Sequence, residues 1–311
     1  MKRGLLVAGF AAMIGLAIFV SRSDANPEIV RIIAPGIWFR EGDLEQQGHC
    51  NNVIIEMKDY LIVVDANFPS GARAAMADAR RISTKPVKYV FDTHHHGDHL
   101  YGNSIWTQAG ATTLAFKGVA EELKRLEPAR WQAAEKTRPD VAELKRQGPE
   151  PPKQDIQEES FVLNDGSRRV EFHHFGWAHT RGDGFVYIPK EEVLCTGDAV
   201  VNGPYNSTTD ADIGNWPTVL RAAEKLKVKH VLPGHGLAGG RELIAGQELF
   251  FVELHKAVQA GIAGGKKLED IQASVKLPDS VDNWVSANSL KTQIKDTYLE
   301  ITQNKPRGDI Q

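Results

Sequence analysis

The chain has 311 residues, with 37 lysines and arginines against 40 aspartates and glutamates, and a formal net charge of −3 at pH 7. No basic stripe with interleaved aromatic residues accompanies this near-neutral balance, so the composition argues against a nucleic-acid partner. The length is sufficient for one large domain with a substantial core, or for two smaller domains.

The N-terminus has the pattern of an export signal. Lys2-Arg3 precedes an apolar run from Leu5 to Val20, and Ser23-Asp24-Ala25 provides small residues for cleavage after it. The run is shorter than the roughly 20 apolar residues that a membrane-spanning helix needs. We therefore predict export across a bacterial inner membrane, to the periplasm or beyond, with residues 1–25 as a signal peptide. An uncleaved membrane anchor is the alternative, because Arg22 directly follows the run.

The first half of the chain alternates predicted strands and helices. Val53–Met57 and Tyr60–Asp65 are β-rich runs separated by Lys58-Asp59, which predicts a hairpin. Gly71–Ile82, with its alanines and spaced arginines, predicts a helix, and Val87–Phe91 predicts the next strand. Strands that alternate with helices indicate an α/β architecture.

A cluster of metal-ligand residues follows the strand that ends at Phe91. The segment from Thr93 to His99 reads T-H-H-H-G-D-H. His94 and His96 project to the same side of an extended chain, while the turn at Gly97 brings Asp98 and His99 toward a second point nearby. Imidazole and carboxylate are preferred ligands of Zn²⁺ and similar metals. The spacing H-x-H-x-D-H therefore predicts half of a two-metal site.

Three further candidate ligands occur where later predicted strands end. They are His179, Asp198 in Thr196-Gly197-Asp198, and His235 in Pro233-Gly234-His235. A rigid sheet that positions ligand-bearing loops is a common way to build a site in α/β folds. The other histidines, His95, His173, His174 and His230, occupy spacer or strand positions and are predicted to be structural.

The second half of the chain combines a charged insert with a helical tail. Glu121–Arg146 predicts a helix that Gly148-Pro149 breaks, and residues 121–159 are either a solvated spacer or a lid over the site. Trp216–Leu226 predicts a helix before the strand Lys229–Leu232. Arg241–Thr302 predicts helix throughout, with a break near Pro278, that packs on the domain or mediates dimer contacts.

These motifs, in this order, resemble those of the metallo-β-lactamase superfamily over about residues 30–243. The resemblance implies a four-layer αβ/βα sandwich with the site along one edge. It implies that His94, His96 and His179 bind one metal, that Asp98, His99 and His235 bind the other, and that Asp198 bridges them. It also implies that Asp65 supports the ligand loop by hydrogen bonds, and Thr93 is predicted to be a second outer neighbour.

The predicted domain division follows from the ligand order. We expect the metallo-β-lactamase domain over residues 26–245, including the charged insert, and a C-terminal helical extension over residues 246–311. Of the two cysteines, Cys195 is predicted to be a buried apolar residue rather than a ligand. An oxidising compartment would permit a Cys50–Cys195 disulfide, and the sequence leaves this question open, as it does the oligomeric state.

The implied ligand set predicts hydrolysis of a small molecule without an organic cofactor. Two Zn²⁺ ions, with manganese or iron as alternatives, would activate a shared water for attack on a carbonyl, and Asp98 would accept or relay a proton. Family β-lactamases do not place a bridging aspartate at the position of Asp198, which favours esters, thioesters, lactones or amides over β-lactams. A β-lactamase and a di-iron redox enzyme are the alternatives. We expect Tyr101–Trp106 and the charged insert to set specificity.

Overall fold

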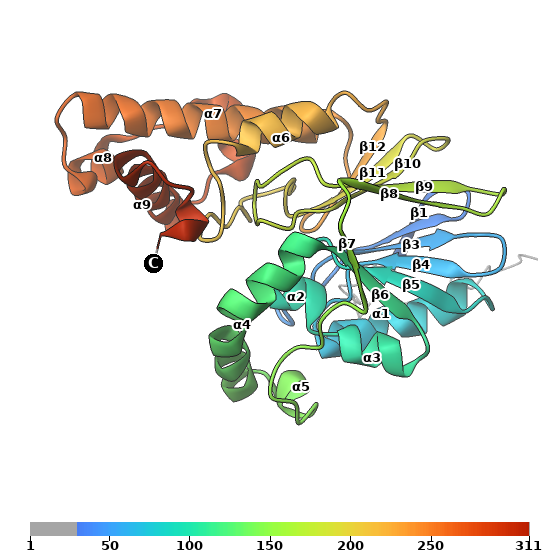
Figure 1. Ribbon diagram of the computed structural model, residues 1–311. Coiled ribbons are helices and arrows are strands. Elements are labelled where there is room, and N and C mark those ends of the chain that lie inside the picture. Colours follow the sequence, from blue (N-terminus) through green and yellow to red (C-terminus); the bar gives the residue numbers. More distant parts are fainter. Residues whose placement is uncertain (1–29, 311) are drawn as a thin grey trace, which may run out of the picture.

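The computed structural model describes residues 30–310 of the chain (Figure 1). The predicted signal peptide, residues 1–25, lies outside the described residues. Among the described helices, none combines the length and apolar content that are needed to cross a bilayer.

The first sheet has seven strands in chain order, from β1 to β7. Its strands are β1 (Val30–Ala34), β2 (Ile37–Arg40), β3 (Asn52–Glu56), β4 (Leu61–Val64), β5 (Val87–Phe91), β6 (Thr112–Phe116) and β7 (Gln154–Ile156). The first four strands pair antiparallel, and β4 to β7 pair parallel. The predicted hairpin and the predicted strand before the histidine cluster are confirmed as β3–β4 and β5.

The second sheet has five strands in the order β12-β11-β10-β9-β8. They are β8 (Ser160–Asn164), β9 (Arg169–His173), β10 (Phe185–Ile188), β11 (Val193–Gly197) and β12 (His230–Pro233). All neighbouring pairs are antiparallel except β11 and β12, which run parallel. The carboxyl ends of β11 and β12 therefore lie at the same edge of the sheet.

The two sheets face each other, and helices cover their outer faces (Figure 1). Between the sheets, Phe91 of β5 packs on Phe172 of β9 with ring centroids 4.8 Å apart. Helices α1 (Pro69–Ile82) and α3 (Asn103–Gln108) cover the first sheet. Helices α6 (Trp216–Ala223) and α7 (Glu242–Ala263) cover the second. The predicted four-layer αβ/βα sandwich is confirmed.

The charged insert contributes to the fold more than the sequence suggested. Its main helix, α4 (Lys117–Thr137), begins earlier and ends sooner than predicted, and a short helix, α5 (Pro139–Ala142), follows. The helix ends there because Pro139 forces the preceding residue, Arg138, into extended backbone with φ −122° and ψ 108°. Strand β7, inside the predicted insert, is one of the two edge strands of the first sheet.

The C-terminal extension is part of the same core. Helix α7 runs through residues 245 and 246, so the predicted boundary falls inside one continuous helix. Trp216 of α6 stacks on Phe251 of α7 with ring centroids 4.0 Å apart. Beyond α7 lie α8 (Leu268–Ser274), the 3-10 helix η1 (Asp279–Trp284), α9 (Ala287–Gln303) and the short η2 (Arg307–Asp309). The chain therefore turns more often than the single predicted break.

Candidate metal centre

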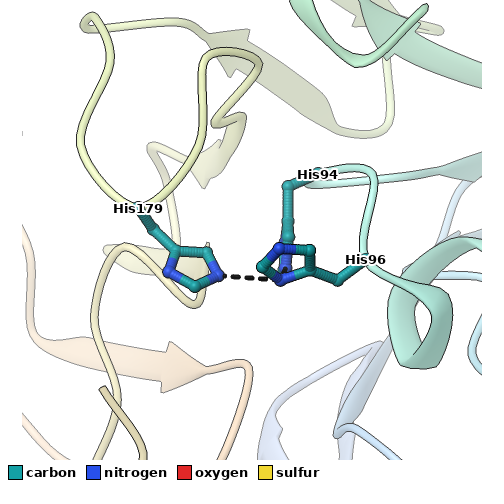
Figure 2. A group of neighbouring side chains, drawn as sticks. All are labelled: His94, His96 and His179. Atoms are coloured by element: carbon teal, nitrogen blue, oxygen red, sulfur yellow. Dashed lines mark hydrogen bonds between the residues drawn. The ribbon is translucent and has the colours of Figure 1, made fainter. Parts of the chain in front are cut away.

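Three imidazole rings meet where loops of the two sheets face each other (Figure 2). His94 and His96 come from the loop between β5 and the short helix α2 (Gly97–Leu100), and His179 comes from the loop between β9 and β10. The Nε2 atoms of His94 and His179 each lie 3.1 Å from Nδ1 of His96. We call these residues the three-histidine cluster.

A second group, the mixed cluster, consists of Asp98, His99 and His235. Asp98 and His99 lie in α2, and His235 follows β12. The Nε2 atom of His235 lies 3.0 Å from Oδ2 of Asp98 and 3.4 Å from Nε2 of His99. Because α2 begins directly after His96, one continuous segment supplies residues to both clusters.

Asp198, which follows β11, lies between the two clusters. Its carboxylate is 3.3 Å from Nε2 of His235, 3.4 Å from Nε2 of His99 and 3.8 Å from Nε2 of His179. Its Oδ1 atom is buried and has no hydrogen-bond partner among the described residues. The structure thus brings together all seven residues that the sequence singled out as ligands.

A glycine next to His235 makes room for this approach. A Cβ atom at Gly234 would lie 2.1 Å from Oδ1 of Asp198 and 3.0 Å from Cε1 of His99. Such contacts are far inside van der Waals distance, so any side chain at this position would displace the carboxylate. The glycine in the Pro-Gly-His sequence at the end of β12 is therefore required by the packing of Asp198 as well as by the turn.

Asp65 and Thr93 lie directly behind the candidate ligands. Oδ2 of Asp65 is 2.9 Å from Nδ1 of His99, and its Oδ1 accepts the backbone N–H of Thr93 at 2.8 Å. The hydroxyl of Thr93 lies 3.1 Å from Nδ1 of His94. Asp65 thus fixes one ring of the mixed cluster and the start of the ligand loop at once.

Sequence reasoning missed Asp210 and Arg130. Oδ2 of Asp210 lies 2.7 Å from Nε2 of His96, which leaves Nδ1 of that ring facing the cluster. The Arg130 guanidinium, on α4, donates to both carboxylate oxygens of Asp210 at 2.6 and 2.8 Å. Asp210 follows no strand and belongs to no spacing motif, and Arg130 looked like one of many solvated charges. The sequence offered no signal for either.

The C-terminal extension supports the loop that carries Asp210. Gln293 of α9 donates to the backbone carbonyl of Asn206 at 2.8 Å. The hydroxyl of Thr208 donates to Asp296 of α9 at 2.7 Å. The insert and the tail therefore both act on the same outer carboxylate of the three-histidine cluster.

The segment Tyr101–Trp106 is not a specificity loop. Tyr101 is buried, donates its hydroxyl hydrogen bond to Glu127 of α4 and packs on Trp131. Trp106 is buried beneath α1 and donates to the Ala66 carbonyl at 3.0 Å. Neither ring is available to a substrate, so this expectation is wrong, and the segment instead attaches α4 to the first sheet.

The remaining histidines and the cysteines have structural surroundings. His95 points away from the clusters, 3.4 Å from Asp210, and His174 contacts the Asp183 carbonyl at 2.8 Å. Cys50 and Cys195 are both free and buried, so there is no disulfide between them. Cys195 packs between the sheets as predicted, whereas Cys50 lies next to His99.

Comparison with known proteins places this geometry in a family. The family model of the metallo-beta-lactamase superfamily matches residues 46–235. The chain belongs to this superfamily. A metallo-beta-lactamase type 2 from Bacillus cereus is 25% identical over 201 residues, which cover 62% of this chain and 70% of the relative. One from Bacteroides fragilis is 31% identical over 94 residues, covering 28% of this chain and 36% of the relative.

Solved structures of superfamily members share the fold. A metallo-beta-lactamase from Pontibacter korlensis superposes with a TM-score of 0.59 at 21% identity, covering 72% of this chain and 98% of that chain. A stereoselective inverting sec-alkylsulfatase from Pseudomonas sp. superposes with a TM-score of 0.70 at 19% identity, covering 88% of this chain and 50% of that chain. Membership of the superfamily implies a metal-dependent hydrolase.

The two clusters of this superfamily member differ in their electrostatics. Burial, together with the neighbouring His96, lowers the pKa of His179 to about 4. In the mixed cluster, burial alone would lower the pKa of His235, but Asp198 and Asp98 raise it to about 9. Burial would raise the pKa of Asp198, yet His235 and His99 hold it well below its usual range. At neutral pH, His179 is therefore neutral, whereas His235 is protonated and Asp198 is ionised.

The donor set fits metal ions. The Ser207 carbonyl, 3.0 Å from Nδ1 of His179, and the Asp210 carboxylate both only accept hydrogen bonds. In the neutral form of each ring, the outer nitrogen that faces this acceptor carries the proton, so the inner nitrogens of His179 and His96 would present lone pairs to each other at 3.1 Å. A cation between them would convert this repulsion into coordination. Oδ1 of Asp198, which has no hydrogen-bond partner among the described residues, is a further oxygen that could coordinate a cation.

Proposed function

We propose that this protein is a dinuclear zinc hydrolase of small molecules, acting on an ester, thioester or lactone carbonyl. The observation that carries the proposal is the position of Asp198, whose carboxylate lies within 3.8 Å of ligand nitrogens from both clusters. A carboxylate that reaches both groups can join two metal ions.

The chain's own residues divide the work around that centre. His94, His96 and His179 would hold one ion, and Asp98, His99 and His235 the other, with Asp198 shared. When bound, two divalent ions polarise a carbonyl oxygen and lower the pKa of the attacking water. Asp65 and Asp210 keep the rings of His99 and His96 in position through hydrogen bonds.

Asp98 is the candidate proton acceptor. Its side chain is 22% exposed, whereas that of Asp198 is 8% exposed, so Asp98 is the more accessible carboxylate to an incoming molecule. Burial alone would raise the pKa of Asp98, but His99 and His235 hold it well below its usual range. It is therefore ionised at neutral pH, which is the form that a proton acceptor or relay needs.

Substrate class is proposed on the ligand set. A bridging aspartate favours ester, thioester and lactone bonds over β-lactams. The related proteins named above include β-lactamases and a sec-alkylsulfatase, so β-lactams and secondary alkyl sulfates are the natural competing substrates. Iron bound in place of zinc would favour the redox alternative.

The test combines metal analysis with substrate profiling of the full chain. We expect two zinc ions per chain, loss of activity on chelation and recovery on zinc addition. Comparison of kcat/KM for esters, thioesters, lactones, a chromogenic cephalosporin and a secondary alkyl sulfate should rank the first three highest. A large preference for the cephalosporin would assign the protein as a β-lactamase instead, and a single tightly bound metal would contradict the dinuclear centre.

A further inference from the structure

A cavity of about 240 Å³ opens beside the mixed cluster. One wall is the connection between β2 and β3, residues 41–46, together with Asn51. The other wall consists of Tyr205, His235, Gly236 and Leu237. Because His235 lines the cavity, a molecule bound there lies directly next to the proposed metal centre.

Three carboxylate side chains line this cavity besides the candidate ligand His235. Glu41, Asp43 and Glu45 line it, and no lysine or arginine does so in the described part of the chain. Glu41 pairs with Arg31 at 2.6 Å, and Asp43 accepts the backbone N–H of Gln46 at 3.0 Å. Glu45 is exposed and has no ion pair among the described residues. The cavity entrance therefore carries negative charge that is only partly compensated.

The opposite wall is apolar and open to solvent. Leu237 is 58% exposed and Tyr205 is 40% exposed, and both belong to the small set of large hydrophobic side chains on the described surface. The Tyr205 ring lies 6.1 Å from the ring of His235. Exposed apolar side chains that border a functional cavity are typical of ligand contacts.

We propose that this cavity holds the acyl group of the substrate and selects uncharged, apolar groups over anionic ones. The inference rests on the proposed hydrolase function and deepens it. Because Glu45 lines the cavity, a negative charge bound there would lie within the Debye length, about 10 Å at 0.1 M salt. The Glu45 carboxylate would therefore repel it. Bicyclic β-lactams carry a carboxylate beside the ring, and alkyl sulfates are anions, so the cavity disfavours both.

A neighbouring cavity does not offset this charge. Gln46 also borders a space of about 420 Å³ on the other side of the same connection, lined by Arg73, Arg138, Asp140 and Glu143. Its two cations are balanced by two carboxylates, and Arg138 is engaged with Asp140 at 3.3 Å. It contains no residue of either cluster.

The test uses two esters with acyl chains of equal length, one ending in a methyl group and the other in a carboxylate. For the zinc-loaded full chain, kcat/KM for 4-nitrophenyl pentanoate should exceed that for mono-4-nitrophenyl glutarate, by roughly tenfold at low ionic strength and less at high salt. Glu45→Lys should reduce the ratio of the pentanoate kcat/KM to the glutarate kcat/KM by about threefold or more, because it reverses one charge at the entrance. Glu269→Lys, the same change at an exposed position of α8, should leave both rates unaltered. Leu237→Ser should reduce the preference for pentanoate over acetate.

Binding separates failure of this inference from failure of the proposed function. The corresponding anilides, pentanoyl and glutaryl, are measured calorimetrically as ligands of the zinc-loaded protein. If the pentanoyl anilide binds more tightly than the glutaryl anilide but neither ester is hydrolysed, the inferred charge selection is supported and the proposed hydrolase function is contradicted. Equal or tighter binding of the glutaryl anilide, or an ester ratio that Glu45→Lys does not move, would overturn the inference.

Discussion

The two clusters of the metal centre lie side by side but are built on different chemistry. In the three-histidine cluster, burial keeps the pKa of His94 and His179 low, so these two rings are neutral nitrogen donors. In the mixed cluster, carboxylates raise the pKa of His235 to about 9, so the same residue type is protonated and paired. The difference shows two ways in which a set of side chains can bind a metal ion. Neutral rings can coordinate the ion directly, whereas a protonated ring in an ion pair must first release its proton.

Their support differs as well. His99 of the mixed cluster is held by Asp65, at the end of β4 in the central part of the first sheet. His96 of the three-histidine cluster is held by Asp210, on a loop that α4 and α9 fix from outside the sandwich. The mixed cluster is thus supported by the first sheet, whereas the three-histidine cluster is supported by helices α4 and α9 outside the sandwich.

Removal of the shared carboxylate should have the largest effect, because it acts on both clusters. Asp198→Ala should weaken metal binding at both and reduce kcat/KM by more than the roughly 10–100-fold that loss of an outer partner costs. Elemental analysis measures the metal content, and steady-state kinetics measures kcat/KM. Asp59→Ala, in the exposed β3–β4 turn at the far end of the sheet, is the control. Two retained metals with full activity would remove Asp198 from the centre.

A matched pair of outer substitutions should separate the clusters. Asp210→Asn should weaken metal binding at the three-histidine cluster by roughly 10–100-fold and leave the mixed cluster unchanged. Asp65→Asn should weaken metal binding at the mixed cluster and leave the three-histidine cluster unchanged. Each keeps the shape of the side chain and removes its charge. Stepwise titration with Co²⁺, followed by its absorption spectrum, resolves the two sites. An identical effect of both variants on both steps would show that the clusters are not independently supported.

The metal-free protein should lose stability on opposite sides of neutrality for the two clusters. The pKa of His235 is raised from 6.5 to about 9, so its stabilising contribution is complete below pH 6.5 and is lost as pH rises through 9. The pKa of His179 is lowered to about 4, so its contribution is present above pH 6.5 and is lost as pH falls toward 4.

Urea denaturation of the metal-free protein across this range measures both effects, which we expect to be on the order of 1–3 kcal/mol. His235→Gln should abolish the alkaline loss and keep the acidic one. An alkaline loss of the same size in that variant would show that another group is responsible.

The smallest effect should come from the insert. Arg130→Gln removes the bidentate partner of Asp210 but leaves that carboxylate on His96, so metal affinity of the three-histidine cluster should fall less than in Asp210→Asn. Lys124→Gln, an exposed change on the same helix, is the control. A loss equal to that of Asp210→Asn would mean that Arg130 is required to keep the carboxylate in place.

The sequence by itself was enough to predict the candidate ligands and the layers. The β-rich runs that became β3, β4 and β5 and the helical pattern of α1 are local, because side chains alternate along a strand and repeat along a helix. Ligands at strand ends were therefore predictable as neighbours: parallel strands bring their carboxyl ends to one edge. All seven predicted ligand positions lie in the two clusters or between them.

Only the tertiary structure decided what surrounds those ligands. Asp210 reaches His96 across 114 positions of sequence, and Arg130 reaches Asp210 across 80, so no local pattern connects them. Tyr101 is buried rather than exposed because α4 packs over it, and α7 continues past residue 245 because its apolar side chains share a core with α6. Periodicity specifies which face of an element is apolar, but which partner covers that face depends on how distant segments pack, and that is decided only when the whole chain folds.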